Sequence, residues 1–265
     1  MQLIDIGANL THESFRRDLP DVLEHAQAAG VAQMIVTGAS RESSLAAREL
    51  AVAHPGVLRA TAGVHPHHAG DYGADTDAAL RALARTPEVV AVGETGLDYF
   101  RDLSPRSAQR AAFERQLAIA IDLGAPLFLH QRDAHADFLA LLKAARDRVP
   151  GAVVHCFTDQ KRALFDYLDL DCHIGITGWI CDERRGAHLV ELVRSIPANR
   201  LMLETDAPYL LPRDLPRPPA NRRNEPAYLA HVCAAVARAR GEGPDATAAN
   251  ATATARAFFG LRPAA

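Results

Sequence analysis

Short apolar runs recur along the chain, and polar or glycine-containing stretches separate them. Each run has the length and continuous hydrophobicity of a strand that is buried on both faces of a sheet. The eight runs are Leu3 to Ile6, Gln33 to Val36, Val57 to Ala62, Val89 to Val92, Pro126 to Leu129, Ala152 to Val154, His173 to Ile176 and Leu201 to Leu203.

The stretches between these runs have helical spacing. Within residues 112–123, the apolar side chains that share one helical face are Phe113, Leu117, Ala120 and Ile121. Residues 225–238 show the same spacing. Alternating strands and helices predict the α/β class, and eight such units favour a closed TIM (β/α)8 barrel. An open, doubly wound sheet has the same local pattern and is the alternative.

Length and composition agree with one barrel. The chain has 265 residues, and such barrels have about 250 residues without dividing into domains. A hydrophobic content of 48% is enough to fill a large core. Because no low-complexity linker or internal sequence repeat divides the chain, we expect residues 1–265 to form a single domain.

Charge and cysteine content restrict the class of protein. A net charge of -3 argues against a protein that coats nucleic acid with its whole surface, although it permits a locally basic cleft. No run approaches the roughly 18 apolar residues of a membrane span, and no basic and apolar leader precedes the first run. The four cysteines lack C-x-x-C spacing, so we expect reduced thiols without a chemical role and a soluble, cytoplasmic protein.

Four of the apolar runs lead into a potential metal ligand. These ligands are Glu94, His130, His155 and Asp206. The loops after the strands of a parallel barrel converge on one face, so the four side chains are expected to meet there. Any one of them alone could be a salt-bridged carboxylate or a hydrogen-bonded core histidine. Their equivalent positions favour a divalent metal site, because imidazole and carboxylate are common ligands of such ions.

Two further positions border the predicted site. Asp206 could bind metal or take a proton from bound water, and Glu204, which is closer to the strand interior, could serve instead or support a ligand. After the third run, His65 is placed to enter the mouth and contact an anionic substrate, although an incidental surface histidine is equally compatible. His67 and His68 are expected to be solvated loop residues.

Several motifs together resemble the TatD family of metal-dependent nucleases over nearly the whole chain. They are Gly63-Val64-His65-Pro66-His67, Gly93-Glu94-Thr95-Gly96-Leu97-Asp98, His130-Gln131-Arg132-Asp133-Ala134, His155-Cys156-Phe157-Thr158, Gly175-Ile176-Thr177-Gly178-Trp179 and Glu204-Thr205-Asp206-Ala207-Pro208-Tyr209. Cys181 to Gly186 and Arg222 to Pro226 resemble the bacterial 3′-to-5′ exonucleases of that family.

The resemblance implies a TIM barrel of the metal-dependent hydrolase type that hydrolyses phosphodiesters. For the bacterial subgroup it implies 3′-to-5′ exonuclease action on single-stranded DNA and RNA, and it leaves open whether the cellular role is in DNA repair or in RNA turnover. Metal would be held at Glu94, His130 and His155, with Asp206 as an acidic active-site residue. We expect Mg²⁺ or Mn²⁺ for activity, with Zn²⁺ also compatible with two histidines, and we assume a monomer.

One motif departs from the common family pattern. Many members have Asp-x-His-x-His on the first strand, whereas this chain has Asp5-Ile6-Gly7-Ala8-Asn9. Gly7 has no side chain and Asn9 is a weak neutral ligand, so one of the two family metal sites is expected to be weakened. The bacterial subgroup also lacks this histidine pair, which leaves the number of bound ions open.

Substrate binding is expected to use cations and aromatic rings near the mouth. The candidate phosphate contacts are Arg132, Arg184, Arg185, Arg222 and Arg223, and the candidate stacking rings are Tyr99, Trp179 and Tyr209. Solvated charge and core packing are their ordinary alternatives. The proline- and arginine-rich residues 212–226 are predicted to be a stiff loop beside the pocket.

Two other kinds of function fit parts of the pattern. A small-molecule or aminoacyl-tRNA ester hydrolase could use the same metal barrel, although such enzymes often have a carboxylated lysine where this chain has Glu94. The only lysines here, Lys143 and Lys161, lie elsewhere. A non-catalytic binding module is the third hypothesis, motivated by Gly7 and Asn9 and opposed by the intact set of potential ligands.

Overall fold

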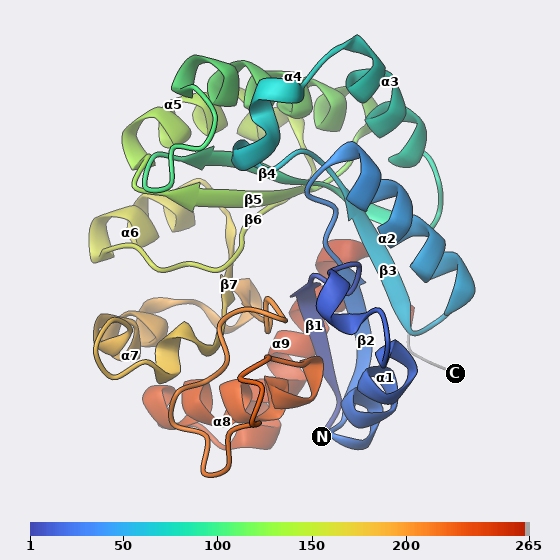
Figure 1. Cartoon of the computed structure of the whole chain (residues 1–265). Coiled ribbons are helices and arrows are strands. Elements are labelled where there is room, and N and C mark those ends of the chain that lie inside the picture. Colours follow the sequence, from blue (N-terminus) through green and yellow to red (C-terminus); the bar gives the residue numbers. More distant parts are fainter. Residues whose placement is uncertain (263–265) are drawn as a thin grey trace.

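Eight parallel strands surround the centre of the molecule, and helices lie outside them (Figure 1). The computed structural model describes residues 1–262. Its strands follow one another around the sheet in chain order, which confirms the predicted barrel. They are β1 (Leu3–Ala8), β2 (Val31–Val36), β3 (Leu58–Ala62), β4 (Val89–Asp98), β5 (Leu127–Arg132), β6 (Ala152–Val154), β7 (His173–Ile176) and β8 (Leu201–Leu203).

The sheet is nearly closed between its first and last strands. Just beyond the end of β1, the Asn9 N–H donates to the Ala207 carbonyl at 2.7 Å, and the Asp206 N–H donates to the Gly7 carbonyl at 2.8 Å. These bonds join segments almost 200 residues apart in the chain. They favour the barrel over the open sheet, and they place Asn9 beside Asp206 at the mouth.

Two strands extend beyond their apolar runs. The predicted fourth and fifth strands end at Val92 and Leu129, whereas β4 continues to Asp98 and β5 to Arg132. The added residues pair with each other in register, for example Gly96 with His130. Glu94 and His130 therefore lie within strands rather than after them. The residues added at the ends of β4 and β5 have low hydrophobicity because they line a polar cluster instead of the apolar core.

The helices form the outer layer around the strands. They are α1 (Leu19–Ala28), α2 (Arg41–Ala53), α3 (Ala74–Leu83), α4 (Arg106–Leu123), α5 (His135–Ala145), α6 (Lys161–Asp169), α7 (Ala187–Leu192), α8 (Leu229–Arg240) and α9 (Pro244–Phe259). The predicted face of α4 is confirmed: Phe113, Leu117 and Ala120 are buried, and Ile121 packs partly buried against the core.

Apolar side chains fill the barrel below the mouth. This inner cluster includes Ile4, Ile6, Ile35, Phe128, Val153 and Met202 from the strands, and Ala255 and Phe259 from α9. Phe258 of α9 contacts the ring of His173, the first residue of β7, with 4.8 Å between ring centroids. Helix α9 therefore covers the end at which the strands begin, and the opposite end is left for a site. Within residues 1–262, no helix has the length and hydrophobicity needed to span a membrane.

Candidate metal centre

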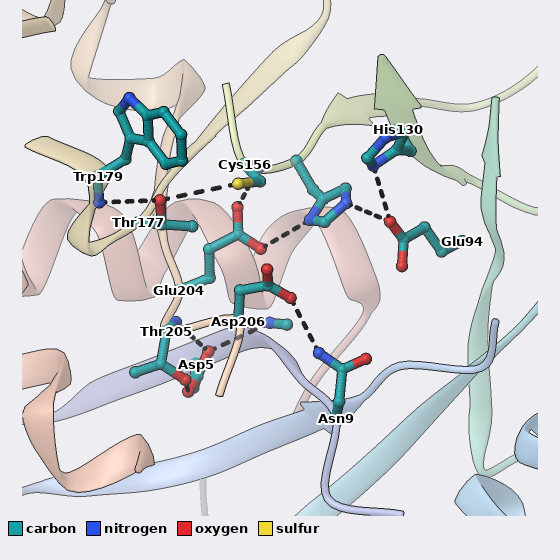
Figure 2. A network of polar contacts seen from close by, with 12 residues as sticks. Asp5, Asn9, Glu94, His130, Cys156, Thr177, Trp179, Glu204, Thr205 and Asp206 are labelled. Atoms are coloured by element: carbon teal, nitrogen blue, oxygen red, sulfur yellow. Dashed lines mark hydrogen bonds and ion pairs between the residues drawn. The ribbon is translucent and has the colours of Figure 1, made fainter. Parts of the chain in front are cut away.

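Three imidazoles converge on one carboxylate oxygen at the mouth of the barrel. The Oε1 atom of Glu94 lies 2.7 Å from Nε2 of His155, 3.0 Å from Nδ1 of His130 and 3.4 Å from Nε2 of His65. Glu94 is 6% exposed, and His130 faces it across the strand ends in Figure 2. The barrel thus brings together side chains from β4, β5 and the loops after β3 and β6.

Glu204 supports this cluster from behind His155. Its Oε2 atom lies 3.3 Å from His155 Nδ1, and its Oε1 atom accepts a hydrogen bond from the Cys156 N–H at 2.5 Å. Glu204 is fully buried, and Gly7 and Gly175 leave the space that its carboxylate occupies, since a Cβ atom at either glycine would collide with it. Glu204 therefore orients His155, as its position near the strand interior suggests.

Asp206 lies beside the cluster, between Glu204 and Asn9 (Figure 2). Its Oδ1 atom accepts a hydrogen bond from Asn9 Nδ2 at 2.9 Å. The backbone just before it is held by Asp5, whose Oδ1 atom accepts from the Thr205 N–H at 2.9 Å. Gly7 and Asn9 thus have defined tasks in this chain: the first makes room for Glu204, and the second orients Asp206.

Asp98 and His67 complete the polar cluster, and the sequence analysis did not include them in the site. Asp98 is 3% exposed and accepts from the backbone N–H groups of Phe100 and Arg101. Its Oδ2 atom lies 2.8 Å from His67 Nε2, so the prediction that His67 is a solvated loop residue is wrong, whereas His68 is exposed as expected. The even spacing of Glu94 and Asp98 along an extended strand was the available signal.

The charges of the cluster depend on one another. Burial alone would raise the pKa of Glu94, but the charges of His155 and His65 and the hydrogen bonds from His130 and His155 lower it well below its usual value. Burial alone would lower the pKa of His155, yet Glu94 and Glu204 raise it well above the ordinary range. Burial raises the pKa of Asp206 to about 7, although His155 opposes this shift. The histidines therefore stabilise the negative charge of Glu94, whereas burial favours the protonated form of Asp206.

The donor set fits a divalent cation. His65, Glu94 and His130 each offer one ligand atom, and these atoms lie within 4.8 Å of one another. Among the residues described, the buried His130 Nε2 has no hydrogen-bond partner; its distance of 3.5 Å to Asp98 Oδ2 is too long for a good bond. Imidazole nitrogens with carboxylate oxygens are suitable ligands for Mn²⁺ or Zn²⁺.

The expected ligands occupy different depths of this site. Glu94 contacts both His130 and His155 directly, and His65 lies slightly farther from the same oxygen. Asp206 is linked to the same cluster through the charges of His155 and Glu94, and its direct contact is with Asn9. The placement is compatible with the predicted set, in which Asp206 is an acidic residue beside the metal.

A pocket of about 430 Å³ is lined by residues that follow His130 and His155 in the chain, and it contains cations around an aromatic ring. The Arg185 guanidinium carbon lies 4.3 Å from the ring centroid of Trp179, and that of Arg132 lies 5.1 Å from it. Arg223, another candidate for phosphate, instead pairs with Asp18 and Glu225 and holds its loop in place. Arg185 also pairs with Asp182, at 2.7 Å, but its side chain is 58% exposed, whereas that of Arg223 is 12% exposed. Arg132 and Arg185 are therefore the better-placed candidates.

Comparisons with known proteins agree with this geometry. A sequence profile of the family described as TatD related DNase matches residues 4–260. Proteins of Citrobacter koseri and Klebsiella pneumoniae, both named 3′-5′ ssDNA/RNA exonuclease TatD, are each 51% identical to this chain over 259 residues. The match covers 98% of this chain and 99% and 98%, respectively, of those proteins.

Solved structures show the same architecture. YJJV, a TatD homolog from Escherichia coli K12, is 27% identical, with a TM-score of 0.90 and 98% of each chain covered. A TatD family hydrolase from Entamoeba histolytica is 23% identical, with a TM-score of 0.88 and 99% of each chain covered, and this second likeness shows the fold alone.

Proposed function

Since this chain belongs to the family of TatD-related DNases, we propose a mechanism for its action as a 3′-to-5′ exonuclease on single-stranded DNA and RNA. The activity follows from relatives of that name that are half identical over nearly the full length. One observation carries the mechanism: the convergence of His65, His130 and His155 on a single oxygen of Glu94.

Glu94, His130, His155 and Asp206 would hold a divalent metal, and Mg²⁺ or Mn²⁺ is the proposed ion for activity. When bound, such an ion polarises a phosphoryl oxygen and makes water nucleophilic near neutral pH. The unpartnered His130 Nε2 and the close spacing of the donor atoms of His65, Glu94 and His130 support a metal at this position. Zn²⁺ would suit the same imidazoles.

The side chains around the ion have separate tasks. Glu204 contacts His155 Nδ1 and so aims Nε2 of the same ring at the metal site. Asp206, oriented by Asn9, accepts the proton of the attacking water. His65 is 8% exposed at the open side of the cluster and donates a hydrogen bond to the scissile phosphate.

The substrate strand would leave the metal centre across the pocket that contains Trp179. A nucleic-acid base can stack on the indole ring, and the flanking guanidinium groups of Arg132 and Arg185 can contact phosphates. Any base can stack on an aromatic ring, and the cations contact only the phosphates of the nucleic-acid backbone. This arrangement suits an exonuclease that removes nucleotides of any sequence.

The alternative of a small-molecule or aminoacyl-tRNA ester hydrolase has less support. A carboxylated lysine often bridges metals in such barrels, whereas Glu94 occupies the fourth strand here. Lys143 and Lys161 lie on the outer helices α5 and α6, and neither is on the fourth strand. We also propose a cytoplasmic location and a role in DNA repair, and the four unpaired thiols and the single-stranded substrate support these assignments.

Substitution of Glu94 tests the mechanism. With Mn²⁺ or Mg²⁺, the wild-type enzyme should shorten a 5′-labelled single strand from its 3′ end, and a chelator should stop the reaction. Glu94→Gln should lower the rate by about 1,000-fold or more, because the imidazoles lose the carboxylate on which they converge. Glu114→Gln, an exposed change on α4, is the matched control and should keep full activity. Near-normal cleavage by Glu94→Gln would contradict the mechanism.

A further inference from the structure

A second cluster of potential metal ligands lies away from the catalytic mouth. Cys181, Asp214 and His231 each offer a ligand atom, and the three atoms lie within 4.8 Å of one another. Cys181 ends the short 3-10 turn Gly178–Cys181 after β7, and Asp214 lies in the segment between β8 and α8, coloured orange in Figure 1. His231 is in the first turn of α8, so the cluster joins three separate segments.

The buried Cys181 thiol lies beside Asp214, whose carboxylate also faces His231 and Arg238. His231 Nε2 lies 2.7 Å from Asp214 Oδ1, and the Arg238 guanidinium is 3.8 Å from the other carboxylate oxygen with a side chain that is 69% exposed. Cys181 is 6% exposed. Burial, together with the charge of Asp214, raises the pKa of the Cys181 thiol to about 12. A buried thiol beside a carboxylate is unfavourable for thiolate formation unless a cation binds between them.

We propose that Cys181, Asp214 and His231 bind one Zn²⁺ ion, with a water molecule as the fourth ligand. A sulfur, a nitrogen and an oxygen donor form a set that Zn²⁺ accepts in tetrahedral geometry, and the soft thiolate disfavours Mg²⁺ and Ca²⁺. This site is distinct from the metal centre of the proposed nuclease mechanism, and none of its residues takes part in that mechanism.

Binding requires a defined exchange of protons. The Cys181 thiol releases its proton to solvent as the sulfur–zinc bond forms. The neutral His231 ring carries its proton on Nδ1, so the lone pair of Nε2 is free to bind the ion. The bond from Nε2 to the ion replaces the present contact between Nε2 and Asp214. Asp214 is half-exposed and on a loop, so its carboxylate can turn toward the ion while Arg238 moves into solvent.

The bound ion would fasten the segment between β8 and α8 to the barrel. This segment begins with the catalytic Asp206 and continues through the proline-rich residues 212–226. It contains little regular structure of its own before the 3-10 turn Pro226–Tyr228. A crosslink from Cys181 to His231 through Asp214 would restrict its conformations and raise the thermal stability of the enzyme.

Cobalt substitution tests the site independently of nuclease activity. Co²⁺ bound to a thiolate gives a ligand-to-metal absorption band that nitrogen and oxygen ligands do not give. Wild-type protein with Co²⁺ should show this band, and Zn²⁺ should displace it. Cys181→Ser should abolish the band, whereas Cys172→Ser, a change of another buried cysteine outside both clusters, should retain it. Cys156→Ser should also retain it, which separates this site from the thiol beside the catalytic centre.

The zinc content provides the second measurement. After equilibration with Zn²⁺ and gel filtration, His231→Gln and Asp214→Asn should each retain about one equivalent less than wild type, and neither change alters a buried core residue. Zinc should raise the thermal unfolding midpoint of wild type more than that of His231→Gln. A wild-type protein without the cobalt band, or equal zinc content in wild type and His231→Gln, would overturn the proposal. Glu94→Gln should retain the cobalt band even when nuclease activity is lost, because Cys181 is outside the catalytic group of ligands, so failure of the nuclease mechanism and failure of this site are distinguishable.

Discussion

Glu204 shows how one buried side chain sets the geometry of the metal centre. It occupies the space over two glycines, Gly7 and Gly175, and contacts both His155 and the Cys156 N–H. A carboxylate that accepts from a ligand imidazole fixes the tautomer and direction of that ring. In this chain Glu204 occupies the space that a side chain at position 7 would need. The absence of a histidine at this position of the first strand is therefore matched by the position of Glu204.

Gly175→Ala should disturb this geometry without removing any ligand. The added methyl group would meet the carboxylate of Glu204 and turn it away from His155, so we expect about a 10- to 100-fold loss of metal affinity or nuclease rate. The measurement is the rate as a function of Mn²⁺ concentration. Gly73→Ala is the control, because a Cβ atom there meets nothing within 4 Å. Unchanged metal dependence in Gly175→Ala would show that Glu204 has no orienting role.

Single residues also show where sequence reasoning ends. Glu94, His130 and His155 could be found because each follows or ends an apolar strand, and strand ends of a parallel barrel converge. Asp98 and His67 were not found, because their contact depends on how far β4 extends and on the path of the loop after β3. The hydrophobicity of nearby residues predicts neither the length of β4 nor the path of this loop.

At the scale of elements, the site is made by strand ends and the segments that follow them. β4 and β5 supply Glu94 and His130, whereas the 3-10 turn after β7 supplies Trp179. The ring lies between Arg132 at the end of β5 and Arg185 before α7, so three elements form the wall of the adjoining pocket. The apolar runs predicted the strands to within two residues at their starts, but the polar ends of β4 and β5 lacked the hydrophobicity that marks a strand.

Arg185→Ala should weaken binding of the strand more than it slows chemistry. Loss of one phosphate-contacting cation should raise the KM for a single-stranded oligonucleotide by about 5- to 20-fold and reduce the salt dependence of binding, with kcat changed little. KM and kcat measured at several salt concentrations test this. Arg85→Ala, an exposed change between α3 and the start of β4, removes the same charge at the opposite end of the barrel and should have little effect. Equal effects of the two substitutions would contradict the assigned pocket.

At the scale of the whole molecule, the two ends of the barrel have different tasks. The mouth collects polar side chains, and the other end is sealed by α9 packed on β1 and β8. The eightfold alternation of apolar runs favoured this architecture over an open sheet. The closing hydrogen bonds between residues 7–9 and 206–207 could not be read from the sequence, because they join segments outside the apolar runs.

The sealed end should contribute to the pH dependence of stability. Burial, with the charge of Arg200, lowers the pKa of His173 to about 4, below the unfolded value of about 6.5. Because the unfolded chain then binds the proton more readily, stability is lost as pH falls from about 6.5 toward 4. His173→Gln should therefore lose about 1 kcal/mol less stability than wild type between pH 7 and pH 5, measured by urea unfolding. The exposed change His68→Gln should follow wild type, and an identical loss in His173→Gln would refute the assignment.

The proposed mechanism requires a divalent ion where the strand ends meet, and anomalous scattering from a crystal soaked in Mn²⁺ tests for it most directly. We expect a peak at about 2.0–2.3 Å from a carboxylate oxygen of Glu94 and from nitrogens of His130 and His155, with Asp206 facing it. A crystal of active enzyme with its manganese bound elsewhere, and none among these four side chains, would contradict it.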